Sequence, residues 1–231
     1  MHTLDTVEVD GIELAYRVWG EREAPPVLLL AGLGADGVDW LGIAPELART
    51  RRVYALDLRG HGASDWPGDY ALERVSDDIV GFLAALGLPR VSVVGHSYGG
   101  VVGYLLAQRH PGLVERLVIE DAPPLWPQDP PLEVPERPAG RLVFDWAVKT
   151  QFTEQRNAPD PRWIEGLSAI TAPTLLIGGG PDSHIPQELL ADMVKRIPDC
   201  RLVTIDAGHL VHETRPEEFL AEVRPFLEAG E

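Results

Sequence analysis

Short apolar runs that alternate with helical patterns restrict the fold of this sequence more than any other feature. Six runs rich in Val, Ile and Leu lie at residues 27–31, 53–57, 91–95, 117–120, 174–177 and 201–205. Such runs suit strands that are buried on both faces of a parallel sheet. Helical periodicity marks residues 73–86, 98–109, 187–197 and 216–227. The alternation predicts an α/β fold, with helices on both faces of a mostly parallel central sheet.

The N-terminal residues follow a different pattern. Residues 6–9 and 12–19 alternate imperfectly around Asp10-Gly11, a dipeptide typical of a tight turn. We therefore expect an antiparallel hairpin at one edge of the sheet. Ligands of open α/β sheets bind at the carboxyl ends of the strands, so functional residues are expected in the loops that follow the apolar runs.

Length and charge limit the organisation of the chain and its partners. The 231 residues predict a single domain spanning residues 1–231. There are 36 acidic and 20 basic residues, and the formal net charge is −16. This balance argues against nucleic-acid binding, which needs a basic surface to displace counterions from phosphates. It also weakly disfavours anionic membranes and polyanionic substrates.

The sequence carries no targeting pattern that we can identify. Residues 1–9 have no apolar run behind a basic region, as a secretory signal would. The longest apolar stretch, residues 27–33, is far shorter than the roughly 20 residues of a membrane helix. The single cysteine, Cys200, cannot form an internal disulfide. We therefore expect a soluble cytoplasmic protein, and its oligomeric state stays open.

One segment interrupts the alternation. Residues 123–161 contain nine of the 21 prolines and two of the six tryptophans, with a short helical patch around residues 142–151. The segment lies between two predicted core strands, and its apolar side chains are too numerous for a solvated linker. We expect residues 123–165, approximately, to form a lid above the sheet.

The hexapeptide Gly95-His96-Ser97-Tyr98-Gly99-Gly100 is the most informative motif. It follows the predicted strand at residues 91–94 and opens the predicted helix at residues 98–109. A serine in a sharp strand-to-helix turn needs glycine neighbours because larger side chains would collide. The turn exposes the hydroxyl above the sheet, and the helix start stabilises negative charge that develops there.

Several motifs in the same order resemble the α/β-hydrolase fold superfamily, in its small single-domain branch. The resemblance extends from the segment at residues 27–34 (VLLLAGLG), through residues 57–64 (DLRGHGAS) and the serine hexapeptide, to Gly208-His209. It therefore covers nearly the whole chain. It implies a hydrolase that uses a serine nucleophile, a histidine base and a carboxylate.

His209 is the candidate base, because it follows the last predicted strand and histidine titrates near neutrality. The resemblance agrees with this position. The carboxylate that would orient the imidazole has two candidates. Asp182, beyond the run at residues 174–177, gives the expected chain order Ser, Asp, His and is the first choice. Asp121, at the end of the run at residues 117–120, is the alternative.

Acyl transfer also needs hydrogen-bond donors for an oxyanion. The backbone N–H of Tyr98, directly after the nucleophile, is one candidate. The resemblance implies the N–H of Leu33 as the second. The family usually has His-Gly before this position, whereas this chain has Ala31-Gly32. Backbone donation survives that change, but the order of the loop depends on other contacts.

Tryptophans that follow predicted strands or lie near the lid favour an apolar or aromatic pocket. Trp40, Trp126 and Trp146 are the candidate substrate contacts. His184 and His212 lie near the expected site and have weaker support. No histidine or cysteine spacing predicts a metal site, and no nucleotide or haem motif predicts a cofactor.

These features predict a serine hydrolase that cleaves a carboxylic ester, thioester or lactone of an apolar or aromatic small molecule through an acyl-enzyme on Ser97. Two alternatives remain. The same residues would serve a C–C bond hydrolase or a perhydrolase, and the scaffold would also serve a ligand-binding or signalling protein with a slow or vestigial site.

Overall fold

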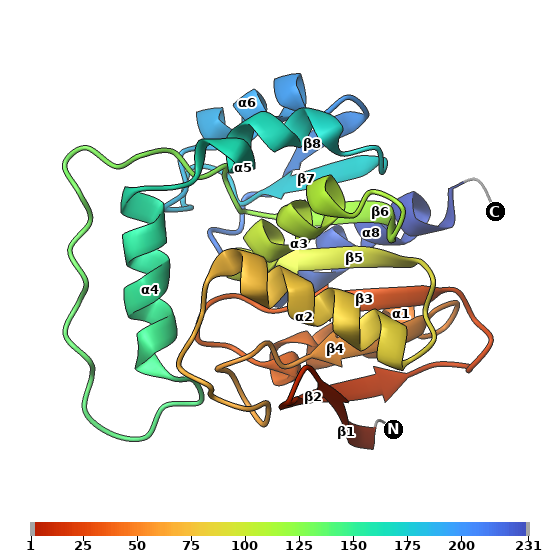
Figure 1. The fold of residues 1–231 in the computed structure, drawn as a ribbon. Coiled ribbons are helices and arrows are strands. Elements are labelled where there is room, and N and C mark those ends of the chain that lie inside the picture. Colours follow the sequence, from red (N-terminus) through yellow and green to blue (C-terminus); the bar gives the residue numbers. More distant parts are fainter. Residues whose placement is uncertain (1–2, 230–231) are drawn as a thin grey trace.

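The apolar runs form one eight-stranded sheet in the computed structural model, which describes residues 3–229 (Figure 1). The order across the sheet is β1-β2-β4-β3-β5-β6-β7-β8. The antiparallel pairs are β1 with β2 and β2 with β4, and the other neighbours are parallel. The strands are β1 Thr3–Val9, β2 Ile12–Trp19, β3 Pro26–Leu30, β4 Arg52–Leu56, β5 Val91–His96, β6 Val114–Glu120, β7 Thr174–Gly178 and β8 Cys200–Thr204.

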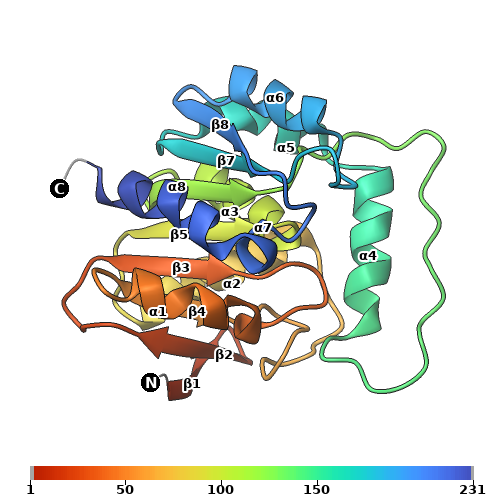
Figure 2. The same cartoon turned by 180° about the vertical axis from the view of Figure 1, so that it is seen from behind.

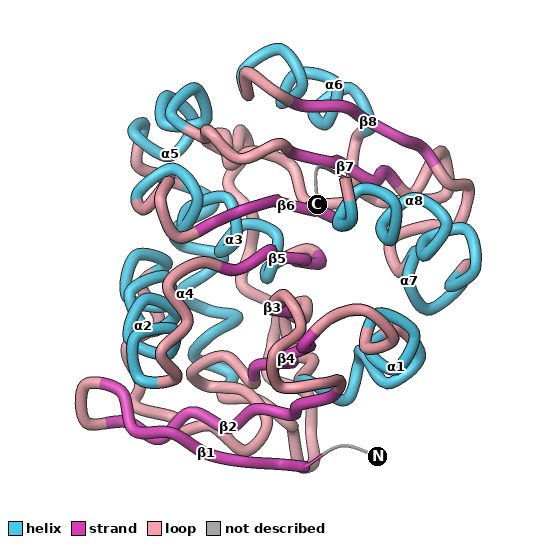
Figure 3. The backbone as a smooth tube through the Cα atoms, turned by 90° about the vertical axis from the view of Figure 1, so that its right-hand side faces the viewer, coloured by secondary structure: helices cyan, strands magenta, loops and turns pink. Residues whose placement is uncertain are grey.

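Helices cover both faces of this sheet. The α-helices are α1 Ala44–Leu47, α2 Leu72–Ala85, α3 Tyr98–Arg109, α4 Trp146–Asn157, α5 Pro161–Glu165, α6 Gln187–Arg196, α7 Val211–Thr214 and α8 Pro216–Glu228, and the 3₁₀ helices are η1 Gly37–Gly42 and η2 Gly166–Ala169. Viewed along the sheet, α2, α3 and α6 lie on one side and α1, α7 and α8 on the other (Figure 3). Figure 2 shows the second layer directly. Among the described residues, no helix is long and apolar enough to span a bilayer.

Each layer packs on its own core. The larger core joins apolar side chains of α2, α3 and α6 to one face of the sheet, and the smaller core joins α1, α7 and α8 to the other. Strands β5 and β7 are buried throughout and β3 is buried apart from Pro26, as the continuous apolar runs predict. The α/β fold class and the N-terminal hairpin predicted from sequence are therefore confirmed.

The segment between β6 and β7 leaves the body of the molecule as an extended loop and returns as α4 (Figure 1). The helical patch expected at residues 142–151 is displaced: α4 begins at Trp146 and continues to Asn157. The cause is a cap, because the Asp145 carboxylate accepts a hydrogen bond from the Ala147 N–H at 3.0 Å. Residues 142–145, at the start of the expected patch, adopt no helix.

Helix α4 is fastened to the loop that precedes α2. The Asp145 carboxylate accepts a hydrogen bond from the Tyr70 hydroxyl at 2.7 Å. The Gln151 side-chain oxygen accepts the Tyr70 N–H at 2.8 Å, and the Gln155 oxygen accepts the Leu72 N–H at 2.8 Å. These contacts satisfy the first N–H groups of α2 and the loop before it. They fix α4 across one end of the sheet.

Candidate active site

Ser97 occupies the sharp turn between β5 and α3. Its φ of 49° lies in the left-handed region, which non-glycine residues adopt rarely and at a cost. The two neighbouring glycines permit the turn: a Cβ on Gly95 would lie 2.4 Å from the Gly99 carbonyl oxygen, and one on Gly99 would lie 2.2 Å from that of Leu30. The crowding expected from the sequence motif is therefore present.

Asp121, rather than Asp182, contacts the imidazole of His209. The Nδ1–H of His209 donates to Asp121 Oδ2 at 2.7 Å. Asp182, the first choice from sequence, is exposed on the loop after β7. That choice is wrong in this structure. The reason is that Gly179 and Gly180 turn the chain so tightly that other residues of the loop, and not Asp182, face Asp121.

Four donors surround the Asp121 carboxylate. Besides His209, it accepts hydrogen bonds from the Gly179 N–H at 2.9 Å, the Gln187 amide at 3.3 Å and the Ser183 hydroxyl. Burial alone would raise the pKa of Asp121, but these hydrogen bonds, from His209 first, outweigh burial and lower it. Asp121 is thus an ionised acceptor for the Nδ1–H of His209.

Two further histidines flank His209. His96 Nε2–H donates to the His209 carbonyl oxygen at 2.9 Å, and the two rings lie 4.7 Å apart. Burial lowers the pKa of His96, which keeps that ring neutral. The His184 ring lies 4.2 Å from the His209 ring on the open side. No local sequence pattern connects His96 with His209, 113 positions further along the chain, so this contact could not be predicted from the sequence.

Ser97 and His209 line one cavity of about 400 Å³ together with Leu33 and His96. Within residues 3–229, no hydrogen bond joins the Ser97 hydroxyl to the His209 ring. Such contacts are often long before substrate binds. The shared cavity nevertheless brings the predicted nucleophile and base to the same carboxyl-end edge of the sheet.

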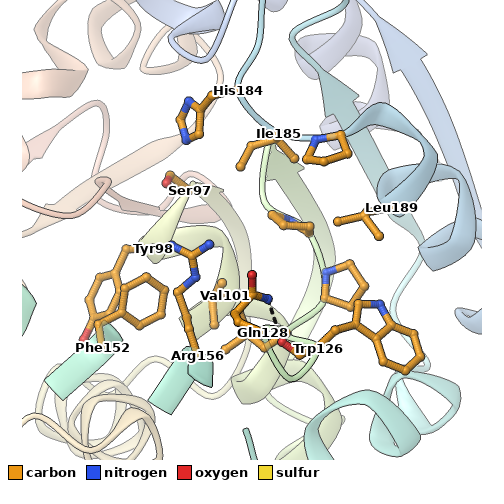
Figure 4. A pocket seen from close by; sticks show the side chains of 14 residues that line it. Ser97, Tyr98, Val101, Trp126, Gln128, Phe152, Arg156, His184, Ile185 and Leu189 are labelled. Carbon is orange, nitrogen blue, oxygen red and sulfur yellow. Dashed lines mark hydrogen bonds between the residues drawn. The ribbon is translucent and has the colours of Figure 1, made fainter. Parts of the chain in front are cut away.

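A second cavity, of about 630 Å³, also begins at Ser97 (Figure 4). Its lining is mainly apolar. It consists of Ser97, Tyr98, Val101, Pro123, Pro124, Leu125, Trp126, Gln128, Phe152, Arg156, His184, Ile185, Pro186 and Leu189. The walls come from α3, from the segment after β6, from α4 and from the start of α6. Residues of the expected lid therefore enclose much of this space.

The three candidate tryptophans have different positions. Trp126 lines the larger cavity. Trp40 is fully buried in the smaller core and stacks on His212, so the expectation that it contacts substrate is wrong. Trp146 begins α4 and packs beside Phe144, and it lines neither cavity at Ser97. Tryptophan positions in sequence do not distinguish a core residue from a pocket residue.

A buried ionic cluster lies behind the site. Glu120, fully buried and directly before Asp121, accepts hydrogen bonds from the His212 N–H at 2.9 Å and from His212 Nδ1 at 2.8 Å. The other ring nitrogen of His212 lies 3.3 Å from Asp39 Oδ2. Burial opposes the charge on His212, but Glu120 and Asp39 raise its pKa to about 10. His212 is therefore a buried cation that does not contact the cavities.

The predicted oxyanion donors lie beside Ser97. Tyr98 is the first residue of α3, so its N–H has no acceptor within the helix. Leu33 lines the smaller cavity with Ser97 and His209. The side chain of His96 packs against Gly32, where an added Cβ would lie 2.8 Å from Nδ1. This contact orders the loop that lacks the family's usual histidine.

Comparisons with known proteins agree with this fold. Residues 25–165 match the α/β-hydrolase fold family. The chain is 25% identical to the sn-1-specific diacylglycerol lipase ABHD11 of Mus musculus, over 96% of this chain and 88% of that protein. It is 31% identical to the 2-hydroxymuconate semialdehyde hydrolase of Pseudomonas sp. (strain CF600), over 87% of this chain and 86% of that protein.

Among solved structures, the enol-lactonase of Burkholderia xenovorans LB400 superposes with a TM-score of 0.82 at 26% identity, over 96% of this chain and 99% of that one. The family match covers more than half of the sequence. The two similar proteins are hydrolases, and this chain aligns with most of the length of each. The chain therefore belongs to the α/β-hydrolase family and is an α/β hydrolase.

Proposed function

We propose that this hydrolase cleaves a carboxylic ester, thioester or lactone through an acyl-enzyme on Ser97. The observation that carries the proposal is the hydrogen bond of 2.7 Å between the buried Asp121 and His209, which lines a cavity together with Ser97. A serine hydroxyl is a weak nucleophile unless a base removes its proton. An imidazole fixed by a carboxylate through Nδ1 has its Nε2 available for that proton.

The acylation step follows from these positions. His209 Nε2 takes the Ser97 proton as the serine oxygen attacks the substrate carbonyl carbon, and the carbonyl oxygen becomes an oxyanion. The N–H groups of Leu33 and Tyr98 stabilise that oxyanion, each by about 10²- to 10³-fold in rate. The imidazolium, stabilised by Asp121, then gives the proton to the departing alkoxide or thiolate.

Deacylation repeats the sequence with water. His209 removes a proton from a water molecule as its oxygen attacks the acyl carbon, and the proton returns to Ser97 when the carboxylic acid leaves. No external co-reactant other than water is needed.

The lining of the larger cavity supports an apolar or aromatic substrate portion. Leu125, Trp126 and Leu189 offer carbon surface, and the volume of about 630 Å³ suits a small molecule. We propose that residues 123–165 act as a lid in the sense that they provide walls of the pocket. Of the three candidate tryptophans, Trp126 is the one that would contact substrate.

Labelling with a fluorophosphonate probe tests the nucleophile. Such probes react with an activated serine, so we expect stoichiometric labelling of the wild-type protein and none of Ser97→Ala. Ser183→Ala is a matched control, because Ser183 is also near His209 but contacts Asp121 instead. Undiminished labelling of Ser97→Ala would remove Ser97 from the mechanism.

A second candidate function is hydrolysis of a carbon–carbon bond by the same residues. It is favoured by the similarity to a protein named as a 2-hydroxymuconate semialdehyde hydrolase. Turnover of p-nitrophenyl esters of increasing chain length separates the two functions. A clear optimum in chain length supports the esterase, whereas labelling by the fluorophosphonate together with negligible turnover of every ester supports the carbon–carbon bond hydrolase.

A further inference from the structure

Helix α4 presents two cations to the cavities at Ser97. Lys149, Phe152 and Arg156 are spaced by three and four residues, so they share one face of the helix. All three line the smaller cavity with Ser97 and His209, and Arg156 also lines the larger one. In Figure 4 the Arg156 side chain extends into the larger cavity beside Phe152. The chain has only two lysines, and one of them is here.

Neither cation has a carboxylate partner. Within residues 3–229, no ion pair of 4.0 Å or less involves Lys149 or Arg156. Two other largely buried arginines differ in this respect: Arg17 in β2 pairs with Asp57 at 2.7 Å, and Arg59 in the loop after β4 pairs with Asp78. The Arg156 guanidinium lies over the Phe152 ring, whose centre is 5.8 Å from the guanidinium carbon.

Burial makes this arrangement unfavourable for the isolated protein. Both side chains are partly buried. Burial lowers the pKa of Arg156, and burial followed by the charge of Arg156 lowers the pKa of Lys149. Partly desolvated like charges without a counterion reduce stability. A bound anion would offset this unfavourable charge, whereas no contact within the described residues does so.

The carboxylates nearest to this space are engaged elsewhere or face solvent. Asp121 is bound to His209, and Asp39 lies against His212. Glu213 lines the smaller cavity but is exposed. The rest of the molecule is strongly acidic, with a net charge of −16, so two unpaired cations beside the nucleophile are a local exception.

We propose that Lys149 and Arg156 form an anion-binding subsite that holds a carboxylate carried by the substrate. The inference rests on the proposed function, because it assigns a substrate class to the Ser97 site. It is compatible with the overall charge, which weakly disfavours polyanionic substrates rather than a single carboxylate. The carboxylate belongs either to the alcohol portion or to the acyl portion of the substrate. Either portion can face the two cations, because Lys149 and Arg156 line the same cavity as Ser97.

Matched pairs of esters test the proposal. For the alcohol portion the pair is 3-acetoxybenzoate and the neutral 3-acetoxybenzamide, and for the acyl portion it is mono-4-nitrophenyl glutarate and 4-nitrophenyl valerate. The quantity measured is the ratio of kcat/KM for the anionic ester to that for its neutral partner. Comparison of this ratio between variants cancels the intrinsic reactivity of each ester.

We expect Lys149→Met and Arg156→Met each to lower this ratio by about 10-fold for at least one pair, as loss of a charge-assisted hydrogen bond implies. Lys195→Met is the matched control: it removes the only other lysine, which is exposed on α6, and should keep the wild-type ratio. An unchanged ratio for both pairs in both α4 variants would overturn the subsite.

Two further measurements separate this proposal from the others. The first is calorimetry of benzoate binding to Ser97→Ala, which needs no turnover. Binding should be lost when Lys149→Met and Arg156→Met are added to this variant, and it should be retained when Lys195→Met is added. This result would stand even if the esterase proposal failed. The Tm of both α4 variants should equal or exceed that of the wild type, whereas a clear fall would show that the cations serve the fold and would overturn the proposal.

Discussion

Ser97 and Asp121 share a backbone conformation that directs both side chains toward the same edge of the sheet. Each directly follows a strand, β5 or β6, and these strands are neighbours. Their φ values are 49° and 45°, and such conformations cost about 1–3 kcal/mol each. Hydrogen bonds hold both turns: the Ser97 N–H donates to the Glu120 carbonyl at 2.9 Å, and the Asp121 N–H donates to that of Ile177 at 2.8 Å.

The contact of Asp121 with His209 predicts different outcomes for the two aspartates. Asp121→Asn should lower kcat by about 10⁴-fold, because an amide no longer fixes the required tautomer or stabilises the imidazolium. Asparagine tolerates a positive φ, so the fold should persist. Asp182→Asn changes an exposed side chain and should alter kcat by no more than about twofold. Ester turnover and the rate of fluorophosphonate labelling measure both, and a larger loss for Asp182→Asn would restore it as the acid.

At this scale, sequence predicts the residues whose surroundings are local. The elbow around Ser97 is encoded by its own glycines, and the Gly208-His209 pair follows the last strand. The acid is not encoded locally, since an aspartate follows both β6 and β7. Which one reaches His209 depends on the turn at Gly179, where an added Cβ would lie 2.0 Å from the Gly208 carbonyl oxygen.

Helix α4 and the loop before it differ in how firmly they are held. The helix is fastened by Asp145, Gln151 and Gln155 to the loop before α2. Residues 133–141 are exposed, and the hydrogen bonds of Arg137 are local ones to Pro138 and Gly140. The helix that carries the proposed subsite is therefore held along its length, whereas residues 133–141 have little to hold them between the anchored residues Leu132 and Val143.

Limited proteolysis should detect this contrast. Trypsin requires an accessible, extended segment, so the first cut is expected after Arg141. Arg137 is equally exposed but precedes proline and should resist. The fragments 1–141 and 142–231 should remain associated, because β7 and β8 stay in the sheet, and Ser97 should still react with fluorophosphonate. Mass spectrometry identifies the cut, and Arg141→Gln is the control. A first cut within the strands or α4 would contradict the assignment.

Among the helices, those of ten residues or more were predictable from periodicity except for the bounds of α4, and shorter helices were not. The sequence predicts α3 with its observed ends and α2, α6 and α8 to within a residue. Helices α1, α5 and α7 have only four or five residues, too few to repeat a helical pattern. The start of α4 depends on the cap at Asp145, which lies inside the segment that periodicity marks as helical.

The ionic cluster behind the site ties distant parts of the molecule together. Glu120 lies at the end of β6, His212 in α7 and Asp39 in η1, and Trp40 covers the His212 ring at 4.3 Å between ring centres. Removing one partner of a buried ion pair typically costs about 3–5 kcal/mol, because the other charge stays buried. Sequence could not reveal this cluster, since its members are far apart in the chain and each resembles an ordinary surface charge.

This cluster gives the stability of the whole molecule a dependence on pH. The pKa of His212 is raised to about 10 in the folded protein and is about 6.5 when unfolded. Its stabilisation is therefore complete below about pH 6.5 and is lost as the pH rises toward 10. The pKa of Glu120 is lowered, although burial opposes this, so its stabilisation is present above its unfolded pKa and is lost in acid.

We accordingly expect the free energy of unfolding to fall between pH 7 and pH 9, below the range where unfolded tyrosines ionise. Urea denaturation at several pH values measures this slope. Lys149, whose pKa is lowered, contributes the opposite trend, so Lys149→Met should steepen the fall. The double variant Glu120→Gln with His212→Gln removes the charges together and should abolish most of the slope. A free energy of unfolding of Lys149→Met that stays constant across this range would show that His212 is neutral in the folded protein.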